Sequence, residues 1–186
     1  LLKFVAPLIL ASIGAFYVSY ADKYFIRLFG TLSDVGLYAL AARISSVLAA
    51  VYEAFNMSWS ADRFEIVKKN NARELYAQVL RFLSAEMILI VSGIALFAND
   101  FLGVMTSPAF YPAGNIVPLL MLSTLISLCK FYCNFGALYS SKTGLLAEAS
   151  WSNVIVVSIA YLWLIPHIGV YGAALSLVVG NFVELW

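Results

Sequence analysis

Among the ionisable residues inside long apolar segments of this sequence, five are the candidates for chemistry there. They are Asp22, Arg43, Glu53, Glu86 and Lys130. An ionisable side chain at membrane depth costs about 2.5 to 3.5 kcal/mol even on lenient insertion scales, so it normally faces a protein interior or a watery cavity. A cation in such a place suits an anionic ligand, and a carboxylate suits a proton, a cation or a cationic side chain. These five residues therefore define the candidate site.

Arg43 and Glu53 occur in one segment, residues 35–60, around which we expect the rest of the chain to be organised. The segment is long enough to cross a bilayer as a helix, for which about 20 mostly apolar residues suffice. Small residues at three- and four-residue spacings allow other helices to approach it closely. They are Ala39, Ala42, Ser46, Ala49, Ala50 and Ala54. The pattern predicts a helix with several packing partners.

The composition places the whole chain in a membrane. Hydrophobic residues make up 63% of the 186 residues and charged residues 11%, and the mean hydropathy is +0.91, which is too apolar for a soluble domain of this length. We predict an all-α integral membrane protein, a bundle of six transmembrane helices. The approximate spans are 4–28, 36–60, 76–98, 114–140, 145–165 and 170–186. A basic, amphipathic connector between the second and third spans suits a helix that lies on a lipid surface and attracts anionic headgroups.

Lysine and arginine are unevenly divided between the two ends of the predicted bundle. Cytoplasmic loops retain these residues in excess. One end collects Lys3, Arg63, Lys68, Lys69, Arg73, Arg81 and Lys142, whereas the other collects Lys23 and Arg27. The asymmetry predicts that both ends of the chain are cytoplasmic.

Given six spans, the buried charges separate into two layers of depth at about 1.5 Å per helical residue. Asp22 and Arg43 fall at similar depths towards the outer side, where they can pair. Glu53, Glu86 and Lys130 fall in the inner half, where they can form a second cluster. Structural ion pairs that only fix helix packing explain the same charges without any role in transport.

These two explanations apply differently to each residue. For Asp22 we favour a packing ion pair with Lys23 or Arg43. Glu53 and Glu86 are equally open as proton or cation sites and as ion-pair partners, so all three carboxylates are possible coupling or pairing groups.

Lys130 is the strongest candidate for a cavity-facing cation, because it belongs to a polar stripe on the fourth predicted span. The stripe consists of Ser123, Ser127, Lys130, Asn134 and Ser141. Cys129 and Cys133, four residues apart on the same span, match neither a metal site nor a secreted disulfide framework, and we interpret them as packing residues. His167 lies in a predicted loop and is given no role. We predict no catalytic residue, metal, cofactor or nucleic-acid partner.

Several local patterns in a consistent order connect this chain to a known family. They are Ala6-Pro7-Leu8, Asp22-Lys23-Tyr24-Phe25-Ile26, Val35-Gly36-Leu37-Tyr38, Arg43, Ala54-Phe55, Trp59, Tyr111, Ala113, Pro118-Leu119-Leu120, Asn153, Ile165-Pro166, Gly169 and Gly172-Ala173-Ala174. With these residues the chain resembles bacterial polysaccharide transporters of the O-antigen flippase type, in the multidrug, oligosaccharidyl-lipid and polysaccharide exporter superfamily. The family often has a second Asn four residues after the first, where this chain has Val157. A role for such an Asn pair is therefore not carried over.

The resemblance implies a two-lobed exporter of about a dozen helices in the bacterial inner membrane, of which residues 1–186 look like the C-terminal lobe. Such proteins move undecaprenyl-pyrophosphate-linked oligosaccharide between leaflets by alternating access, with cation coupling in some members. Arg43 and Lys130 are then the candidate substrate-binding cations, and the partners are the lipid-linked oligosaccharide, membrane lipids and a missing N-terminal lobe. We also interpret the chain as a piece of a longer protein, because no cleavable signal segment precedes its first apolar run.

Two other functions remain open from the sequence. A cation-coupled multidrug antiporter of the same superfamily is the first alternative, since Glu53 and Glu86 nearly balance Arg43 and Lys130. A membrane polysaccharide polymerase or ligase is a more distant one, because that enzyme is expected to need a large outer loop with catalytic polar residues. The predicted outer loops are short.

Overall fold

A computed structural model describes residues 2–140 and 143–185, and within these ranges it contains seven α-helices and one 3-10 helix, η1. The elements are α1 (Leu2–Phe29), α2 (Leu32–Ile66), α3 (Ala72–Met105), η1 (Pro108–Asn115), α4 (Val117–Cys133), α5 (Phe135–Tyr139), α6 (Thr143–Ile168) and α7 (Val170–Leu185). Ser141 and Lys142, used above for the polar stripe and the charge asymmetry, lie outside the described residues, as does the side chain of Lys3.

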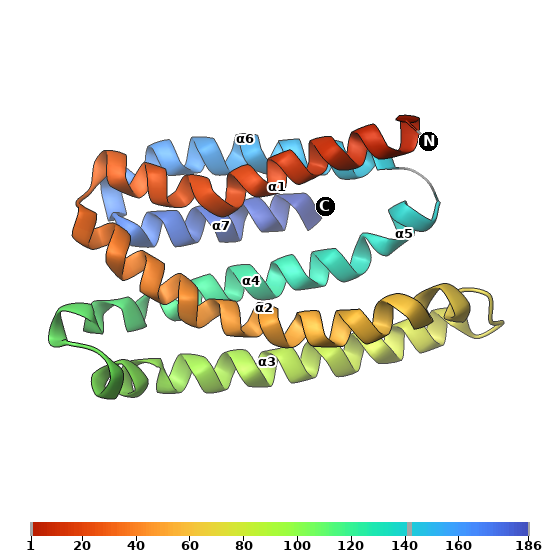
Figure 1. Cartoon of the computed structure of the whole chain (residues 1–186), viewed down its shortest axis with the longest axis horizontal. Helices are drawn as coiled ribbons and strands as arrows, with labels where there is room; N and C mark the ends of the chain where they lie inside the picture. Colours follow the sequence, from red (N-terminus) through yellow and green to blue (C-terminus); the bar gives the residue numbers. More distant parts are fainter. Residues whose placement is uncertain (1, 141–142, 186) are drawn as a thin grey trace.

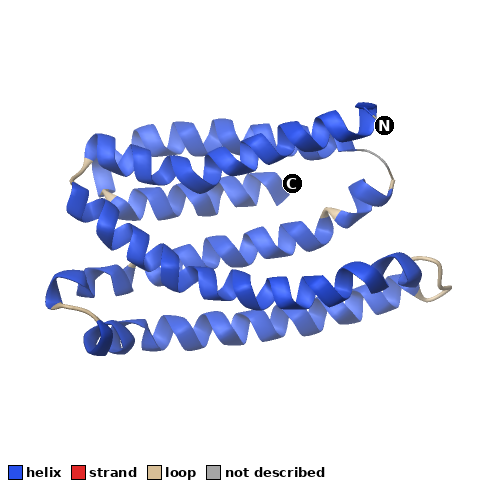
Figure 2. Cartoon of the chain, viewed as in Figure 1, coloured by secondary structure: helices blue, strands red, loops and turns tan. Residues whose placement is uncertain are grey.

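The long helices lie side by side and run back and forth along the long axis of the molecule (Figure 1). Helix α6 packs against both α1 and α7, which gives one group of three helices. Helices α2, α3 and α4 form a second group, and the contact between α4 and α7 joins the two groups. In the described part of the chain every regular element is helical, as Figure 2 shows. The prediction of an all-α membrane protein is confirmed at this level.

The number of spans differs from the predicted six. Within the described residues, four helices, α1, α2, α3 and α6, are long and apolar enough to cross a membrane. A fifth span results if η1 and α4, which meet at a bend of 43°, count as one. Helix α7 has only 16 residues in the described range. Since about 20 residues are needed to cross the hydrocarbon, α7 is short for a span on its own.

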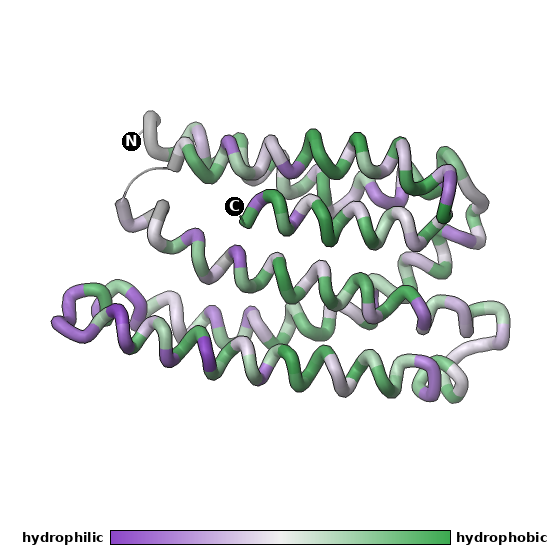
Figure 3. The backbone as a smooth tube through the Cα atoms, turned by 180° about the vertical axis from the view of Figure 1, so that it is seen from behind, coloured by the Kyte–Doolittle hydropathy of each residue, from purple (hydrophilic) through white to green (hydrophobic). Residues whose placement is uncertain are grey.

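Helix boundaries also differ from the predicted spans, and at the α2–α3 end the helices continue into the polar connector. The second predicted span ends at residue 60 but α2 continues to Ile66, and the third was expected from 76 to 98 but α3 occupies Ala72–Met105. The charged residues of the connector therefore extend two long helices instead of forming a separate surface helix. Hydrophilic residues gather at the turn between α2 and α3 (Figure 3).

A capping box fixes the start of α2, and with it the position of every residue along that helix. The Asp34 carboxylate accepts a hydrogen bond from the Thr31 backbone N–H at 2.8 Å, and the Thr31 hydroxyl accepts one from the Asp34 N–H at 3.2 Å. This reciprocal pair satisfies two N–H groups that a helix start otherwise leaves without partners.

The connection between α6 and α7 is tighter than the predicted loop. Helix α6 continues through Pro166, so His167 lies in its last turn, with Nδ1 2.7 Å from the carbonyl oxygen of Trp163. Gly169 then adopts a φ of 59°, which a residue without Cβ tolerates easily. Three residues later, in the first turn of α7, Gly172 lies against the backbone of Leu164. The two helices therefore leave the turn in close contact.

We expect Gly172→Ala to destabilise the protein, because the added Cβ would lie 2.5 Å from the Leu164 carbonyl oxygen and the backbone cannot rotate away. Overpacking of this kind costs about 1 to 3 kcal/mol. Thermal unfolding in detergent, followed by circular dichroism, measures the loss. Gly103→Ala is the matched control, since a Cβ at Gly103 meets no atom within 4 Å and alanine favours a helix more than glycine does. Equal unfolding temperatures for Gly172→Ala and wild type would contradict the close approach.

Candidate functional site

A cavity of about 420 Å³ lies where α1, α2, α4, α6 and α7 meet. Its lining is rich in small and hydroxyl side chains, and its charged residues within the described ranges are Asp22, Lys130 and Glu184. The hydroxyl residues are Ser19, Ser45, Ser46, Ser123, Thr124 and Ser127. A volume of this size matches the usual range for small-molecule sites. The cavity is therefore a polar space inside a bundle whose outer surface is largely apolar.

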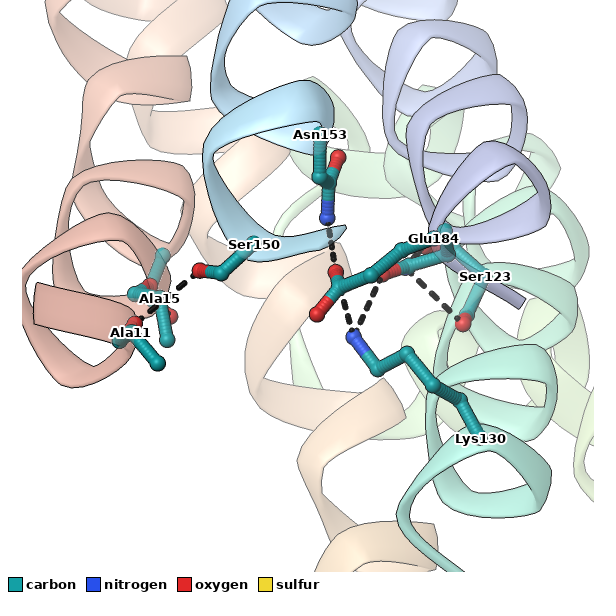
Figure 4. A network of polar contacts seen from close by, with 9 residues as sticks. Ala11, Ala15, Ser123, Lys130, Ser150, Asn153 and Glu184 are labelled. Atoms are coloured by element: carbon teal, nitrogen blue, oxygen red, sulfur yellow. Dashed lines mark hydrogen bonds and ion pairs between the residues drawn. The ribbon is translucent and has the colours of Figure 1, made fainter. Parts of the chain in front are cut away.

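Lys130 and Glu184 form an ion pair in the lining of the cavity. The Lys130 Nζ lies 2.7 Å from Glu184 Oε2, and each side chain is only 12% exposed. The Lys130 Nζ also donates to the side-chain oxygen of Asn181 at 3.4 Å. Helix α4 supplies the lysine and α7 supplies the carboxylate (Figure 4). The pair therefore connects the two groups of helices.

Each charge of this pair has a neutral asparagine partner as well. The Asn153 side-chain N–H on α6 donates to the same Glu184 oxygen that binds Lys130. On the other side of the pair, Asn181 donates to the Ser123 hydroxyl at 2.9 Å and to the Ser123 carbonyl at 3.2 Å. Buried charges are stable only when their hydrogen-bonding capacity is met. The two asparagines supply part of that requirement.

Gly180 allows Asn153 to reach this network. A Cβ at Gly180 would collide with the side chains of Asn153 and Val157, so only glycine lets α6 and α7 approach closely here. Gly180 lies one helical turn before Glu184 on α7. Val157 is fully buried and packs against α7 at Gly180.

Asp22 lies elsewhere in the cavity, among aromatic hydroxyl groups. It is 4% exposed, and its carboxylate is 3.6 Å from the Lys23 ammonium. The hydroxyls of Tyr38 and Tyr161 are buried and interact electrostatically with Asp22. This buried oxygen cluster contains one carboxylate and two hydroxyls.

The Asp22 cluster and the Lys130 network lie at different heights in the bundle. At about 1.5 Å per residue, Asp22, Tyr38 and Tyr161 lie about 10 Å from the end where α1, α2 and α6 turn, and Asn153 and Glu184 about 20 Å from it. Two layers of polar groups therefore exist, and their members differ from the two groups expected from the sequence.

The structure separates most of the other residues that the sequence had grouped. Arg43 is exposed on α2 and does not line the cavity, and Asp22 pairs with Lys23 in its place. Among the described residues, Glu53 and Glu86 form no ion pair. Both are exposed, and Glu53 lies on the same side of α2 as Arg43, because residues 43, 46, 50 and 53 are spaced by three or four.

Glu184 is the functional residue that the sequence reasoning missed. It lies inside the sixth predicted span, and the rule that drew attention to the other buried charges applies to it equally. Asn181, three residues earlier on the same helix, gave a second signal. Ser123 and Ser127 of the predicted polar stripe do line the cavity together with Lys130.

No protein-family model and no solved structure matches this chain. The chain is 22% identical over 171 residues to a protein described as a probable low-salt glycan biosynthesis flippase, Agl15, from Haloferax volcanii. The match covers 90% of this chain and 36% of that protein, so the chain spans about a third of the relative's length. That relative is archaeal. The helices and this distant similarity together support a multi-pass membrane protein related to a flippase.

We expect Asn153→Ala to destabilise the protein, because Glu184 loses a buried hydrogen bond that its charge strengthens. Hydrogen bonds to charged groups contribute about 1.5 to 3 kcal/mol. Thermal unfolding in detergent measures the difference from wild type. Asn70→Ala is the control, since Asn70 is exposed in the turn between α2 and α3. If both variants unfold at the wild-type temperature, the Asn153 contact does not contribute to the fold.

Proposed function

We propose that residues 1–186 form one lobe of a two-lobed flippase that carries undecaprenyl-pyrophosphate-linked oligosaccharide across the bacterial cytoplasmic membrane. The observation that carries the proposal is Lys130, a cation whose side chain is only 12% exposed, in a hydroxyl-lined cavity between apolar helices. The similarity to a protein named as a glycan biosynthesis flippase supports this class of substrate. It also favours a transporter over the alternative of a membrane polysaccharide polymerase or ligase.

The cavity has the chemistry that this substrate requires. A pyrophosphate cannot enter hydrocarbon with its charge uncompensated, so its route between helices needs a cation. The sugars need hydroxyl and amide groups, which the serines of the lining and the asparagines at positions 153 and 181 offer. A polyprenyl chain can remain in the lipid beside the apolar outer helices. One end of the molecule therefore travels in the cavity while the other stays in the membrane.

Alternating access requires a second lobe, and α2 offers a surface to it. Arg43 and Glu53 lie on the exposed side of this helix, with the exposed small residues Ser46 and Ala50 between them. We propose that this side faces the N-terminal lobe across the substrate path, where Arg43 contributes a second cation. The excess of lysine and arginine at the α2–α3 end supports a cytoplasmic location for that end.

The Asp22 cluster favours cation coupling, which also keeps the multidrug antiporter as a second candidate. Hard cations prefer oxygen ligands, and buried carboxylates in membranes serve as proton relays. The Asp22 carboxylate with the buried hydroxyls of Tyr38 and Tyr161 offers such oxygens. Coupling at Asp22 is compatible with either cargo, because Lys130 lies in the other polar layer.

We expect Lys130→Gln in the full-length protein to reduce the appearance of lipid-linked oligosaccharide in the outer leaflet at least tenfold at matched membrane expression. Glutamine keeps the hydrogen-bonding capacity but removes the charge that compensates the pyrophosphate. Lys68→Gln is the control, because Lys68 is an exposed cation in the turn between α2 and α3. Arg43→Gln in the same assay measures the contribution of the exposed side of α2. Wild-type export by Lys130→Gln would refute the substrate site.

We expect Asp22→Asn to abolish the dependence of transport on a sodium or proton gradient. An amide does not take up a proton near neutral pH, and it lacks the negative charge with which a carboxylate binds a cation. Transport by the full-length protein in proteoliposomes, with and without each gradient, measures this. Asp62→Asn removes an exposed carboxylate of α2 and serves as the control. An unchanged response to both gradients in Asp22→Asn would leave the cluster with a packing role.

A further inference from the structure

We infer that Glu184 occupies the anion site of the cavity and that an anionic ligand must displace it from Lys130. The inference rests on the proposed function, because it concerns the cation that this function assigns to the substrate. It adds an exchange of partners at Lys130 to each transport cycle.

The first step of the argument is the position of the Glu184 carboxylate. Its Oε2 lies 2.7 Å from Lys130 Nζ and accepts a hydrogen bond from the Asn153 side chain. Phosphate oxygens and carboxylate oxygens use the same donors at the same distances. Glu184 therefore stands where an oxygen of an anionic ligand would bind. The ligand and Glu184 cannot both bind Lys130 at this position, so they compete for the ammonium.

The second step is the charge of the lining. Its charged side chains within the described ranges are one cation, Lys130, and two carboxylates, Asp22 and Glu184. With Lys130 paired to Glu184, and Asp22 paired to Lys23, the cavity lining within the described ranges offers an anion no free cation. An anion gains a favourable interaction only when Lys130 exchanges one negative partner for another.

The third step is that each member of the ion pair keeps a neutral partner when the pair opens. Glu184 retains the hydrogen bond from Asn153, and Lys130 retains the side-chain oxygen of Asn181 at 3.4 Å. Asn181 is itself fixed by two hydrogen bonds to Ser123. An unpaired charge shielded from water is unfavourable, and neutral hydrogen-bond partners lower that cost. The two asparagines thus make the separated state accessible and position the charges for exchange.

Binding of inorganic pyrophosphate to the purified full-length protein, measured by calorimetry, tests the exchange. We expect Glu184→Gln to bind at least tenfold more tightly than wild type, because Lys130 no longer has an internal anion. Lys130→Gln should bind at least tenfold more weakly. Glu148→Gln should match wild type, since Glu148 is an exposed carboxylate of α6 outside the cavity lining. Equal affinities of Glu184→Gln and wild type would overturn the inference.

A second measurement on the wild-type protein does not depend on the folding of a variant. A hydrophobic carbodiimide modifies accessible carboxyl groups, and mass spectrometry locates the product. We expect saturating pyrophosphate to increase modification of Glu184 severalfold and to leave Glu148 unchanged. Unchanged modification of Glu184 at saturation would also overturn the inference.

A third arm identifies the source of the anion and separates this inference from the proposed function. Nanodiscs that contain a polyprenyl pyrophosphate should raise Glu184 modification at a lower concentration than inorganic pyrophosphate does. One outcome is that inorganic pyrophosphate raises Glu184 modification, polyprenyl pyrophosphate does not, and Lys130→Gln still flips lipid-linked sugar. That outcome would support the exchange of partners and refute the proposed substrate. If Lys130→Gln stops flipping but Glu184→Gln binds no more tightly, the proposed function stands and the exchange falls.

Discussion

The cost of placing Lys130 inside a bundle of apolar helices is the constraint on which the rest of the structure depends. A lysine on α4 needs a counter-charge at the same depth, and Glu184 on α7 provides it. This contact lies where α4 and α7 join the two groups of helices. The α6–α7 hairpin must then be tight enough to bring Asn153 to the same carboxylate, which the glycines at positions 172 and 180 permit. Sequence features far apart along the chain thus serve one electrostatic requirement.

Much of the fold follows from hydropathy and length, because a helix that crosses lipid must satisfy its own backbone hydrogen bonds. The main spans and their order could be predicted for this reason. The ends of the helices could not be predicted, since hydropathy marks where an apolar segment ends and not where the helix ends. Arg63 and Glu65 are polar, yet they continue α2 towards its end at Ile66. Pro166 is a second case, because it lies within α6 and not in the predicted loop. A membrane helix tolerates proline when neighbouring groups compensate for the lost hydrogen bond.

The candidate site was predictable residue by residue but not in its pairings. Lys130 could be selected from its depth and from the polar stripe around it, both of which are local properties. Its partner depends on which helices are neighbours and on how each is rotated, and neither is encoded in spacing along one helix. Glu53 lies at a suitable depth but is exposed on α2, whereas Glu184 has both the depth and the direction. Depth limits the possible partners of a buried charge, and helix rotation selects among them.

The length of α2 has a mechanical consequence. Its 35 residues span about 52 Å at 1.5 Å per residue, whereas a bilayer's hydrocarbon core is about 30 Å thick. One unbroken helix is therefore long enough to reach from the layer that holds Tyr38 to a point beyond the lipid. There the chain reverses direction and continues as α3, which has 34 residues. A rotation at one end of such a continuous helix is passed on to its other end. A force applied to the polar tip in water would turn the wall of the cavity, because no break along α2 is present to absorb the rotation.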